Sequence, residues 1–262
     1  MSGKNRLVLA VNIGNTVTKL GLFYGKELKG TWVVMTTSPT TVSEVQTVLM
    51  TFAASLRDDS LKRFDDGIIA SVVPTVTDKW IGALNLECGK TPLVVGPGLK
   101  TGLKLGYSDP SEIGADRIAN AVAARSKYAC PLIVINMEAT TTFEVINDKG
   151  EFSGGLIAPG LEVSVRELSN VAAKIPVFQV KAPTSVIAKS TKESVQAGAV
   201  LGEVARIDGL VHMIWKELGY ETQVIAAGSH AKLIQSLSET IDECVENLTL
   251  HGLNLLYARN RK

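Results

Sequence analysis

The chain opens with the stretch Leu-Val-Leu-Ala-Val-Asn-Ile-Gly-Asn-Thr-Val-Thr, residues 7–18, in which an apolar run ends in a polar turn that contains a glycine. This pattern predicts a buried strand over Leu7–Val11, a tight turn over Asn12–Thr16 and a second strand over Lys19–Tyr24. A Gly-Lys turn then leads into a third predicted strand, Thr31–Met35. Because short turns join them, the three strands are expected to be antiparallel neighbours.

The same order of residues returns in the second half of the chain. Residues 132–142 read Leu-Ile-Val-Ile-Asn-Met-Glu-Ala-Thr-Thr-Thr. An offset of 124 residues places Asn136, Thr140 and Thr142 over Asn12, Thr16 and Thr18. The repeat predicts an α/β protein of two similar lobes that face a cleft, divided into residues 1–120 and 121–262.

Between and after these copies, apolar periodicity and turn residues predict the remaining elements. The predicted helices are Ser43–Leu56, Lys79–Leu86, Asp116–Lys127, Leu161–Ala173, Thr191–Leu218, His230–Leu237 and Leu248–Arg259. The predicted strands are Gly67–Val73, Pro92–Val95, Phe143–Ile146, Gln223–Ala226 and Asn247–Leu250. Ser43 is placed to cap the first helix. The Gly-, Pro-, Ser- and Asp-rich segment Gly96–Ile113 is long for a loop in a compact protein, which favours a functional role.

Composition excludes several classes of protein. The 262 residues are 45% hydrophobic and 20% charged with a net charge of +1, so no strong field attracts nucleic acid. No apolar run reaches the ~20 residues of a membrane span, and the N-terminal residues lack a signal-peptide pattern. Cys88, Cys130 and Cys244 lie far apart and are odd in number, which predicts neither a disulfide framework nor a zinc site. We therefore expect a cytoplasmic protein.

The duplicated turn is typical of a phosphate-binding device. In such a device the strand ends in a carboxylate that holds Mg²⁺, while the backbone N–H groups of a glycine turn and a hydroxyl bind phosphate oxygens. Two facing copies clamp a nucleotide in the actin, hexokinase and acetate kinase group, whose lobes are of the ribonuclease H-like type. Here the plan is visible, but Asn12 and Asn136 stand where the carboxylates are expected.

Several further motifs make the resemblance specific. In order, they are Asn12-Ile13-Gly14-Asn15-Thr16, Tyr107 with Pro110, Gly114-Ala115-Asp116-Arg117, Gly154-Gly155-Leu156-Ile157-Ala158-Pro159-Gly160, Ala173-Lys174-Ile175-Pro176 and Gln196-Ala197-Gly198. Together they resemble the type III pantothenate kinases, over essentially the whole of residues 7–260. The resemblance implies ATP-dependent phosphorylation of pantothenate, the first step of coenzyme A biosynthesis.

The resemblance also implies a substrate site. Asp116 matches the general base that acts on the pantothenate hydroxyl, and Arg117 matches the group that binds the substrate carboxylate. Tyr107, Gly114 and Ala115 match positions that line the pantothenate pocket. Thr191 matches a substrate-contacting threonine supplied by the partner subunit, because family members are homodimers with shared sites. The alternative for Asp116 and Arg117 is an ordinary helix N-terminus, where Asp favours the helix dipole.

On the nucleotide side, the resemblance implies ATP with Mg²⁺ and a monovalent cation, K⁺ or NH₄⁺. Asn12 matches the Mg²⁺-binding Asp and Asn136 matches the Asp that binds the monovalent cation. The positions expected to contact the nucleotide are Asn12, Gly14, Asn15, Thr16, Lys19, Ala139, Thr140, Thr141 and Gly228.

The departures from the family concentrate on this side. Two neutral amides replace charged ligands, and Glu138-Ala139 replaces Gly-Thr, which brings bulk and negative charge to a phosphate position. Ala227-Gly228-Ser229 replaces Thr-Gly-Gly near the adenosine, and Ala188 replaces a glycine. These changes predict weakened or lost kinase activity.

Two alternatives remain open for this altered nucleotide side. In the first, Glu138 compensates for the lost acids as a metal ligand. In the second, the chain is a non-catalytic paralogue that senses a pantoyl ligand or acts as a regulatory partner. A dinucleotide oxidoreductase is disfavoured because no GxGxxG motif follows the first strand.

Overall fold

The computed structural model describes residues 6–37, 41–171 and 180–261, which form two compact units. Unit 1 comprises Met1–Leu103, Tyr107–Ser126 and Leu248–Lys262, and unit 2 comprises Lys104–Gly106 and Lys127–Asn247. The units therefore differ from a simple division at residue 120 because the last helix of the chain joins unit 1.

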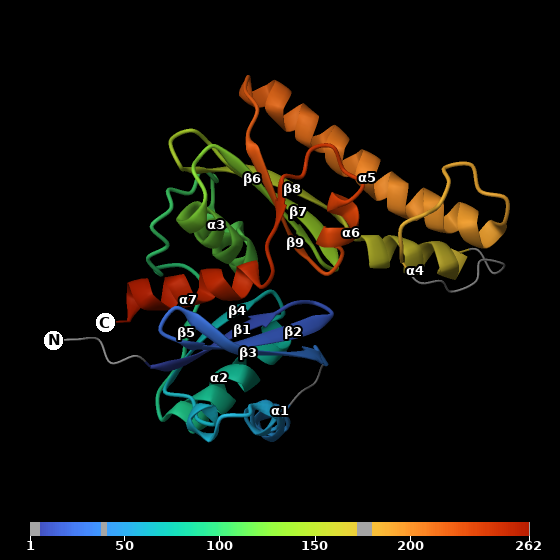
Figure 1. Cartoon of the computed structure of the whole chain (residues 1–262). Coiled ribbons are helices and arrows are strands. Elements are labelled where there is room, and N and C mark those ends of the chain that lie inside the picture. Colours follow the sequence, from blue (N-terminus) through green and yellow to red (C-terminus); the bar gives the residue numbers. More distant parts are fainter. Residues whose placement is uncertain (1–5, 38–40, 172–179, 262) are drawn as a thin grey trace. The chain divides into compact units, whose positions relative to one another are not determined.

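Unit 1 is built on a five-stranded mixed sheet in the order β3-β2-β1-β4-β5 (Figure 1). Its strands are β1 (Leu7–Ile13), β2 (Val17–Tyr24), β3 (Glu27–Met35), β4 (Asp66–Ser71) and β5 (Leu93–Val94). The first three strands pair antiparallel through the two predicted turns, whereas β4 runs parallel to β1 and β5 runs parallel to β4. The central strand β1 is covered on both faces, which explains its nearly continuous apolar sequence.

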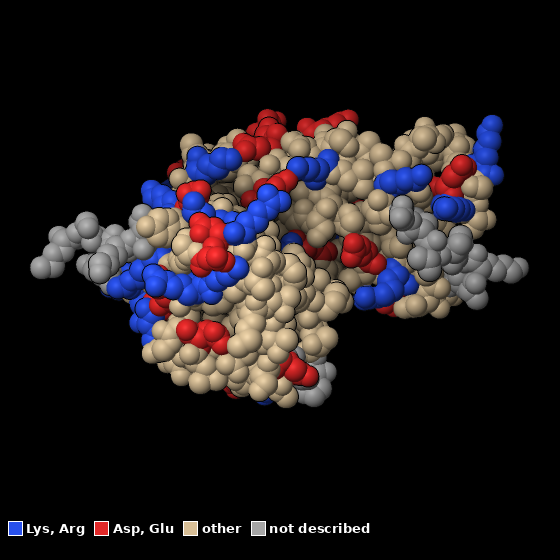
Figure 2. All heavy atoms as spheres, turned by 60° about the horizontal axis from the view of Figure 1, so that its bottom comes forward, with Lys and Arg blue, Asp and Glu red and all other residues tan. Residues whose placement is uncertain are grey.

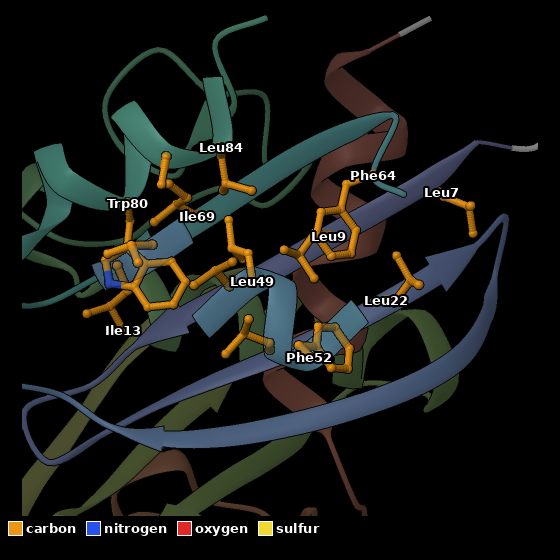
Figure 3. Packing of buried hydrophobic residues seen from close by; sticks show 14 of the residues in the cluster. Leu7, Leu9, Ile13, Leu22, Leu49, Phe52, Phe64, Ile69, Trp80 and Leu84 are labelled. Carbon is orange, nitrogen blue, oxygen red and sulfur yellow. The ribbon is translucent and has the colours of Figure 1, made fainter. Parts of the chain in front are cut away.

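Helices cover both faces of this first sheet. On one face, α1 (Val42–Ser55) and α2 (Pro74–Cys88) pack on alternate residues of β1, and Phe52, Trp80 and Leu84 enclose the core between them (Figure 3). The C-terminal helix α7 (Leu248–Asn260) packs on β1 and β4 from the other face, beside α3 (Ala115–Lys127). Since side chains alternate along a strand, Asn12 lies on the α7 face, away from the α1 and α2 core.

Unit 2 repeats this plan, with its sheet in the order β10-β9-β6-β7-β8. Its strands are β6 (Leu132–Met137), β7 (Thr140–Ile146), β8 (Phe152–Pro159), β9 (Gln223–Gly228) and β10 (Glu243–Cys244). Again three antiparallel strands are followed by two that run parallel to the central one. Helices α4 (Leu161–Val171), α5 (Thr191–Leu218) and α6 (Ala231–Gln235) contribute to the core of this unit. The predicted duplication is thus confirmed by two sheets of the same topology.

Local predictions failed at the cap of α1, at one strand near the C-terminus and at β8. The cap of α1 is Thr41, whose hydroxyl accepts from the Glu44 N–H, so Ser43 lies inside the helix. The predicted strand Asn247–Leu250 is wrong: α7 begins at Leu248, and the short strand is Glu243–Cys244. Strand β8 was not predicted, because its glycines were interpreted only as a motif. The Ala173–Pro176 motif and the predicted end of α4 at Ala173 lie outside the described residues.

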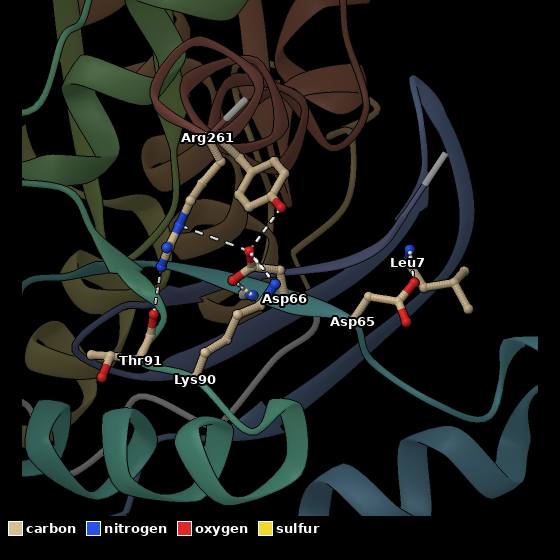
Figure 4. A network of polar contacts seen from close by, with 8 residues as sticks. Leu7, Asp65, Asp66, Lys90, Thr91 and Arg261 are labelled. Carbon is tan, nitrogen blue, oxygen red and sulfur yellow. Dashed lines mark hydrogen bonds and ion pairs between the residues drawn. The ribbon is translucent and has the colours of Figure 1, made fainter. Parts of the chain in front are cut away.

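Unit 1 is further held together by a buried acid beneath α7 (Figure 4). Asp66 is fully buried and accepts hydrogen bonds from the Tyr257 hydroxyl at 2.8 Å and the Gly67 N–H at 2.9 Å. It also pairs with Lys90 at 2.9 Å and lies 3.8 Å from Arg261 Nε. Burial alone would raise the pKa of Asp66, but the hydrogen bonds from Lys90, Tyr257 and Gly67 outweigh it, and the pKa is lowered.

The distribution of charged side chains on the surface is consistent with the balanced composition. On the face drawn in Figure 2, acidic side chains lie among the basic ones rather than apart from them. Within the described ranges, no helix is both long and apolar enough to cross a membrane. The α/β fold of two similar lobes is the one that the repeat predicted.

Candidate active site

The β1–β2 turn lies at the carboxyl end of the central strand of unit 1. Asn12 is half-buried there and pairs with Lys19 on β2 and Ala70 on β4. The turn is closed by the Gly14 N–H, which donates to the Val17 C=O at 3.0 Å. Among the other candidates of this turn, Thr16 is half-buried and Asn15 is exposed. The turn therefore presents an amide and small polar groups, but no carboxylate of its own.

The end of β4 adds hydroxyl groups beside this turn. Ser71 pairs with Ile13, and its Oγ accepts hydrogen bonds from the Thr77 hydroxyl at 2.7 Å and the Val73 N–H at 3.1 Å. Sequence reasoning missed Ser71 and Thr77, because nothing in the sequence of β4 and α2 signals that these residues flank the turn.

The predicted substrate residues of unit 1 lie together at the start of α3. Arg117 is only 5% exposed, and its Nη1 donates to the Tyr107 hydroxyl at 3.1 Å. Its guanidinium carbon lies 6.0 Å from the centre of the Tyr107 ring, the distance of a cation–π contact. Asp116 Oδ1 accepts from the Arg117 backbone N–H at 2.9 Å. A buried cation, a phenol and a carboxylate thus meet in one group, which we call the Tyr107–Arg117 group.

The environment of Asp116 suits it to proton transfer. Burial raises the pKa of Asp116 against the opposing effect of its hydrogen bonds to backbone N–H groups and of the Arg117 charge. A carboxyl group with a raised pKa is a stronger base once ionised. Gly114 leaves room for it, since a Cβ there would lie 2.7 Å from Asp116 Oδ1. Ala115, buried at the start of α3, adds a small apolar contact surface.

The β6–β7 turn is the second copy, and it is closely packed by two other loops. Asn136 is 7% exposed at the end of β6, and the Glu138 N–H donates to the Thr140 C=O at 3.0 Å. A Cβ on Gly160 would lie 2.2 Å from the Glu138 carbonyl oxygen, and one on Gly228 would lie 2.2 Å from the Met137 carbonyl oxygen. Only glycine permits these approaches, and Gly228 also has a left-handed φ of 106°.

The acid in this turn has a specific partner. Ser229, which follows Gly228, donates its hydroxyl hydrogen to Glu138 Oε2 at 3.0 Å, and its N–H donates to the Met137 C=O at 3.0 Å. Ala139 is half-buried beside Glu138. Glu138 and Ser229, two positions that were interpreted from the sequence as departures, therefore contact each other.

The two candidate threonines of β7 have different environments. Thr140 is exposed, whereas Thr141 is fully buried and its hydroxyl donates to Glu203 Oε1 at 2.8 Å. Glu203 on α5 forms an ion pair with Arg206, which also donates to the Pro159 C=O at 2.7 Å. This network holds β7 and the end of β8 to α5. Sequence reasoning missed Glu203 because its partners lie on other elements.

Thr191 is exposed as the first residue of α5, next to a cavity of about 610 Å³ in unit 2. The cavity is lined by the loop before α5 and by the first turns of that helix, including Ala188, Ser190, Lys192 and Gln196. The structure does not bring Thr191 together with the Tyr107–Arg117 group within either unit, because the two lie in different units.

The donor groups at the two turns do not fit a resident hard cation. Mg²⁺ is usually held by one or two carboxylates together with substrate phosphates. Asn12 and Asn136 offer neutral amide oxygens, and Glu138 is the carboxylate of the second turn. In the portion of the chain that the structure describes, no three His, Cys, Asp or Glu side chains are grouped as a metal site.

Comparisons with known proteins identify the family. The sequence pattern of the family described as type III pantothenate kinase matches residues 8–213. The type III pantothenate kinase of Syntrophotalea carbinolica is 40% identical over 255 residues, which cover 97% of this chain and all of that protein.

Solved structures with low sequence identity share the fold. The ethanolamine utilization protein EutJ from Carboxydothermus hydrogenoformans has a TM-score of 0.57 at 13% identity, covering 98% of this chain and 91% of that one. MreB 5 of Spiroplasma citri, solved with AMPPNP bound, has a TM-score of 0.56 at 11% identity, covering 98% and 97%. These likenesses support the two-lobed actin-like architecture.

Proposed function

This chain belongs to the type III pantothenate kinase family, and from that premise we propose that it phosphorylates pantothenate or a similar pantoyl compound with ATP, at a reduced rate. The product of the family reaction is 4′-phosphopantothenate. The observation that carries the proposal is the Tyr107–Arg117 group, which unites a substrate-binding cation with a carboxyl group of raised pKa.

Each member of this group has a definite task in the proposed reaction. Arg117 binds the pantothenate carboxylate through its planar fork of donors, and Tyr107 orients that fork through its hydroxyl. Asp116 accepts the proton of the substrate hydroxyl as that oxygen bonds to the γ-phosphorus of ATP, while the bond from this phosphorus to the β,γ-bridging oxygen breaks and ADP leaves. Gly114 and Ala115 shape the pocket wall beside Asp116.

The nucleotide side is where we expect the rate to be lost. Mg²⁺ enters with ATP as part of the substrate, and the amide of Asn12 replaces the carboxylate that would hold it. Asn136 likewise weakens the site proposed for K⁺ or NH₄⁺. Loss of one such charge-stabilising contact costs about two to three decades in rate. The phosphates are expected near Gly14, Asn15, Thr16 and Lys19 of the first turn, and near Ala139, Thr140, Thr141 and Gly228 of unit 2.

The assembly belongs to the same proposal. We expect a homodimer in which Thr191 of one subunit contacts the substrate of the other, as the family resemblance implies. The exposed position of Thr191 at the start of α5 supports this assignment. A cytoplasmic location follows from the substrates.

A non-catalytic role is the second candidate, and one observation favours it. The Ser229 hydrogen bond holds the Glu138 carboxylate in the turn where phosphates are expected. A protein that retains the Tyr107–Arg117 group but admits ATP poorly would act as a sensor of a pantoyl ligand or as a regulatory partner.

Direct product measurement separates these candidates. Purified protein is mixed with ATP, pantothenate, Mg²⁺ and K⁺, and phosphopantothenate is followed beside the variant Asn12→Asp, Asn136→Asp, Glu138→Gly, Ala139→Thr. We expect slow turnover that rises at least about 100-fold in the restored variant. Turnover of roughly 1 s⁻¹ or faster by the unaltered protein would contradict the reduced rate. Pantothenate binding without turnover in the unaltered protein would establish the non-catalytic role.

A further inference from the structure

A glutamate side chain, Glu138, lies at the carboxyl ends of the two central parallel strands of unit 2. Strands β6 and β9 are neighbours and run parallel, with Met137 paired to Gly228 at their ends (Figure 1). Glu138 follows β6 directly and Ser229 follows β9 directly, and the Ser229 hydroxyl binds Glu138 Oε2 at 3.0 Å. In open α/β sheets this edge is where ligands bind.

The surrounding backbone fixes the turn that carries the Glu138 side chain. Gly160 approaches the Glu138 carbonyl oxygen, and its N–H donates to the Ala139 C=O at 3.0 Å. Ser229 is itself tied to β6 through its N–H and the Met137 C=O. The carboxylate is thus held by a hydroxyl whose own backbone is anchored to the same strand.

A nearby glutamate, Glu162, provides a matched control for Glu138. Glu162, in the first turn of α4, lies two residues after Gly160 and pairs with His230 Nε2 at 3.0 Å. Glu162 is 67% exposed, whereas Glu138 is half-buried. Two carboxylates therefore contact the same Ser229–His230 turn, but one of them belongs to the β6–β7 turn and the other does not.

We propose that Glu138, positioned by Ser229, determines the charge selectivity of unit 2. Its carboxylate weakens the binding of ligands that carry a di- or triphosphate and leaves the binding of uncharged nucleosides unchanged. This inference rests on the proposed function, which places the nucleotide at this turn. Two like charges about 4 Å apart in water repel with an energy that corresponds to about a fivefold loss of affinity, and the loss grows with each phosphate and with desolvation. The unaltered protein should therefore bind adenosine more tightly than ADP, and ADP more tightly than ATP.

The test compares two carboxylate-to-amide variants that remove the same charge. Dissociation constants of adenosine, ADP and ATP are measured by calorimetry for the unaltered protein, Glu138→Gln and Glu162→Gln, each with and without Mg²⁺. Glu138→Gln should bind ATP at least about tenfold more tightly in the absence of Mg²⁺ and leave adenosine within about twofold. Glu162→Gln should change both values by less than about twofold, because surface charges are well screened.

A third variant examines the hydrogen bond. Ser229→Ala retains the charge but releases the carboxylate, so ATP affinity should rise by a smaller factor than in Glu138→Gln. An unchanged ATP affinity in Glu138→Gln, including an absence of measurable binding, overturns the proposal. A weaker affinity for ATP with Mg²⁺ in that variant also overturns it and identifies Glu138 as a metal ligand. Pantothenate binding is measured on the same samples and reports separately on the Tyr107–Arg117 group. An absence of pantothenate binding would contradict the proposed function and would leave the charge selectivity of Glu138 to be decided by the nucleotide affinities.

Discussion

The two central turns of this protein occupy the same place in two sheets of the same topology, yet they are built differently. In unit 1, Ile13 pairs with Thr18, so four residues lie between the paired positions. In unit 2, Met137 pairs with Thr141, so only three residues do. The first turn contains Gly14, while the second contains a glutamate that is hydrogen-bonded to a neighbouring loop.

The missing residue changes which threonines are equivalent. The constant offset of 124 residues places Thr142 over Thr18, but the strand pairing makes Thr141 the counterpart of Thr18. Both are buried, Thr18 at 1% exposure and Thr141 at 0%, on the sheet face that carries the helical core. A slip of one residue moves a side chain to the other face of a sheet. The offset of 124 residues therefore matches structurally equivalent residues up to the turn, but not in the strands that follow it.

The largest expected effect tests whether the substrate side retains its chemistry while the nucleotide side limits the rate. Asp116→Asn, made in the restored variant described above, should lower kcat by about 10²- to 10⁴-fold, because the general base is removed. The Kd for pantothenate should change much less, since Arg117 and Tyr107 remain. Steady-state kinetics and calorimetry measure the two quantities.

The pH dependence of turnover tests the same role of Asp116. Asp116 must be ionised to accept a proton, and burial raises its pKa, so turnover should rise with pH through a value above about 3.9, the usual pKa of Asp. Glu112→Gln, an exposed acid in the loop before α3, is the control and should leave kcat within about twofold. An equal loss in both variants would show that the loop, rather than a base, had been disturbed.

The second prediction concerns the acid that secures α7 to unit 1. Asp66→Asn should lower the free energy of unfolding by about 2 to 3 kcal/mol at pH 7, below the ~3–5 kcal/mol of a fully buried pair because Lys90 is one-third exposed. The pKa of Asp66 is lowered on folding, so this stabilisation is present above the unfolded pKa of about 3.9 and is lost as the pH falls through the folded value.

Denaturant unfolding at a series of pH values measures the difference in the free energy of unfolding between the unaltered protein and Asp66→Asn. The two curves should converge as the pH falls below about 4. Asp59→Asn, an exposed acid paired with Lys62, is the matched control, with an expected change below about 1 kcal/mol at any pH. A difference that persisted in acid would mean that Asp66 acts through packing rather than charge.

Much of the fold could be predicted because it depends on local patterns. The apolar strands, the polar turns and the repeat predicted two similar α/β lobes, and the long loop before α3 was correctly interpreted as irregular apart from the short 3₁₀ turn Pro110–Glu112. The grouping of Tyr107 with Arg117 was implied by the resemblance alone. Long-range contacts gave no local signal. Helix α7 joins unit 1 although it follows unit 2 in the sequence, and the bonds of Ser229 to Glu138 and of Thr141 to Glu203 join segments 91 and 62 residues apart.

The third prediction restores one turn at a time. Asn12→Asp alone should raise turnover by about 10- to 100-fold at saturating Mg²⁺, because one carboxylate returns to the turn that has no other acid. Asn136→Asp alone should raise it by less than about tenfold, since Glu138 already places a negative charge beside that position. Phosphopantothenate formation is followed in K⁺ and in Na⁺. The reverse order of effects would assign the main defect to unit 2.

The smallest expected effect separates the two equivalent threonines. Thr18 shares a hydrogen bond of 2.8 Å with the Thr36 hydroxyl, a neutral pair, whereas Thr141 donates to the carboxylate of Glu203 at 2.8 Å. Thr→Val keeps the shape and removes the donor, and a hydrogen bond to a charged group contributes about 1.5–3 kcal/mol against about 0.5–1.5 for a neutral one. Thr141→Val should therefore destabilise the protein by about 2 kcal/mol and Thr18→Val by about 1 kcal/mol.

Chemical denaturation of both variants, beside Thr141→Val with Glu203→Gln, makes the comparison quantitative. If the charge of Glu203 causes the difference, the two substitutions at residues 141 and 203 should be non-additive by about 1 kcal/mol, because they break one shared interaction. Thr18→Val in the Glu203→Gln background should be additive, since the two sites lie in different units. If the two threonine substitutions lowered the free energy of unfolding equally, the structural difference between the two copies would be confined to the turns and would not extend into the strands that follow them.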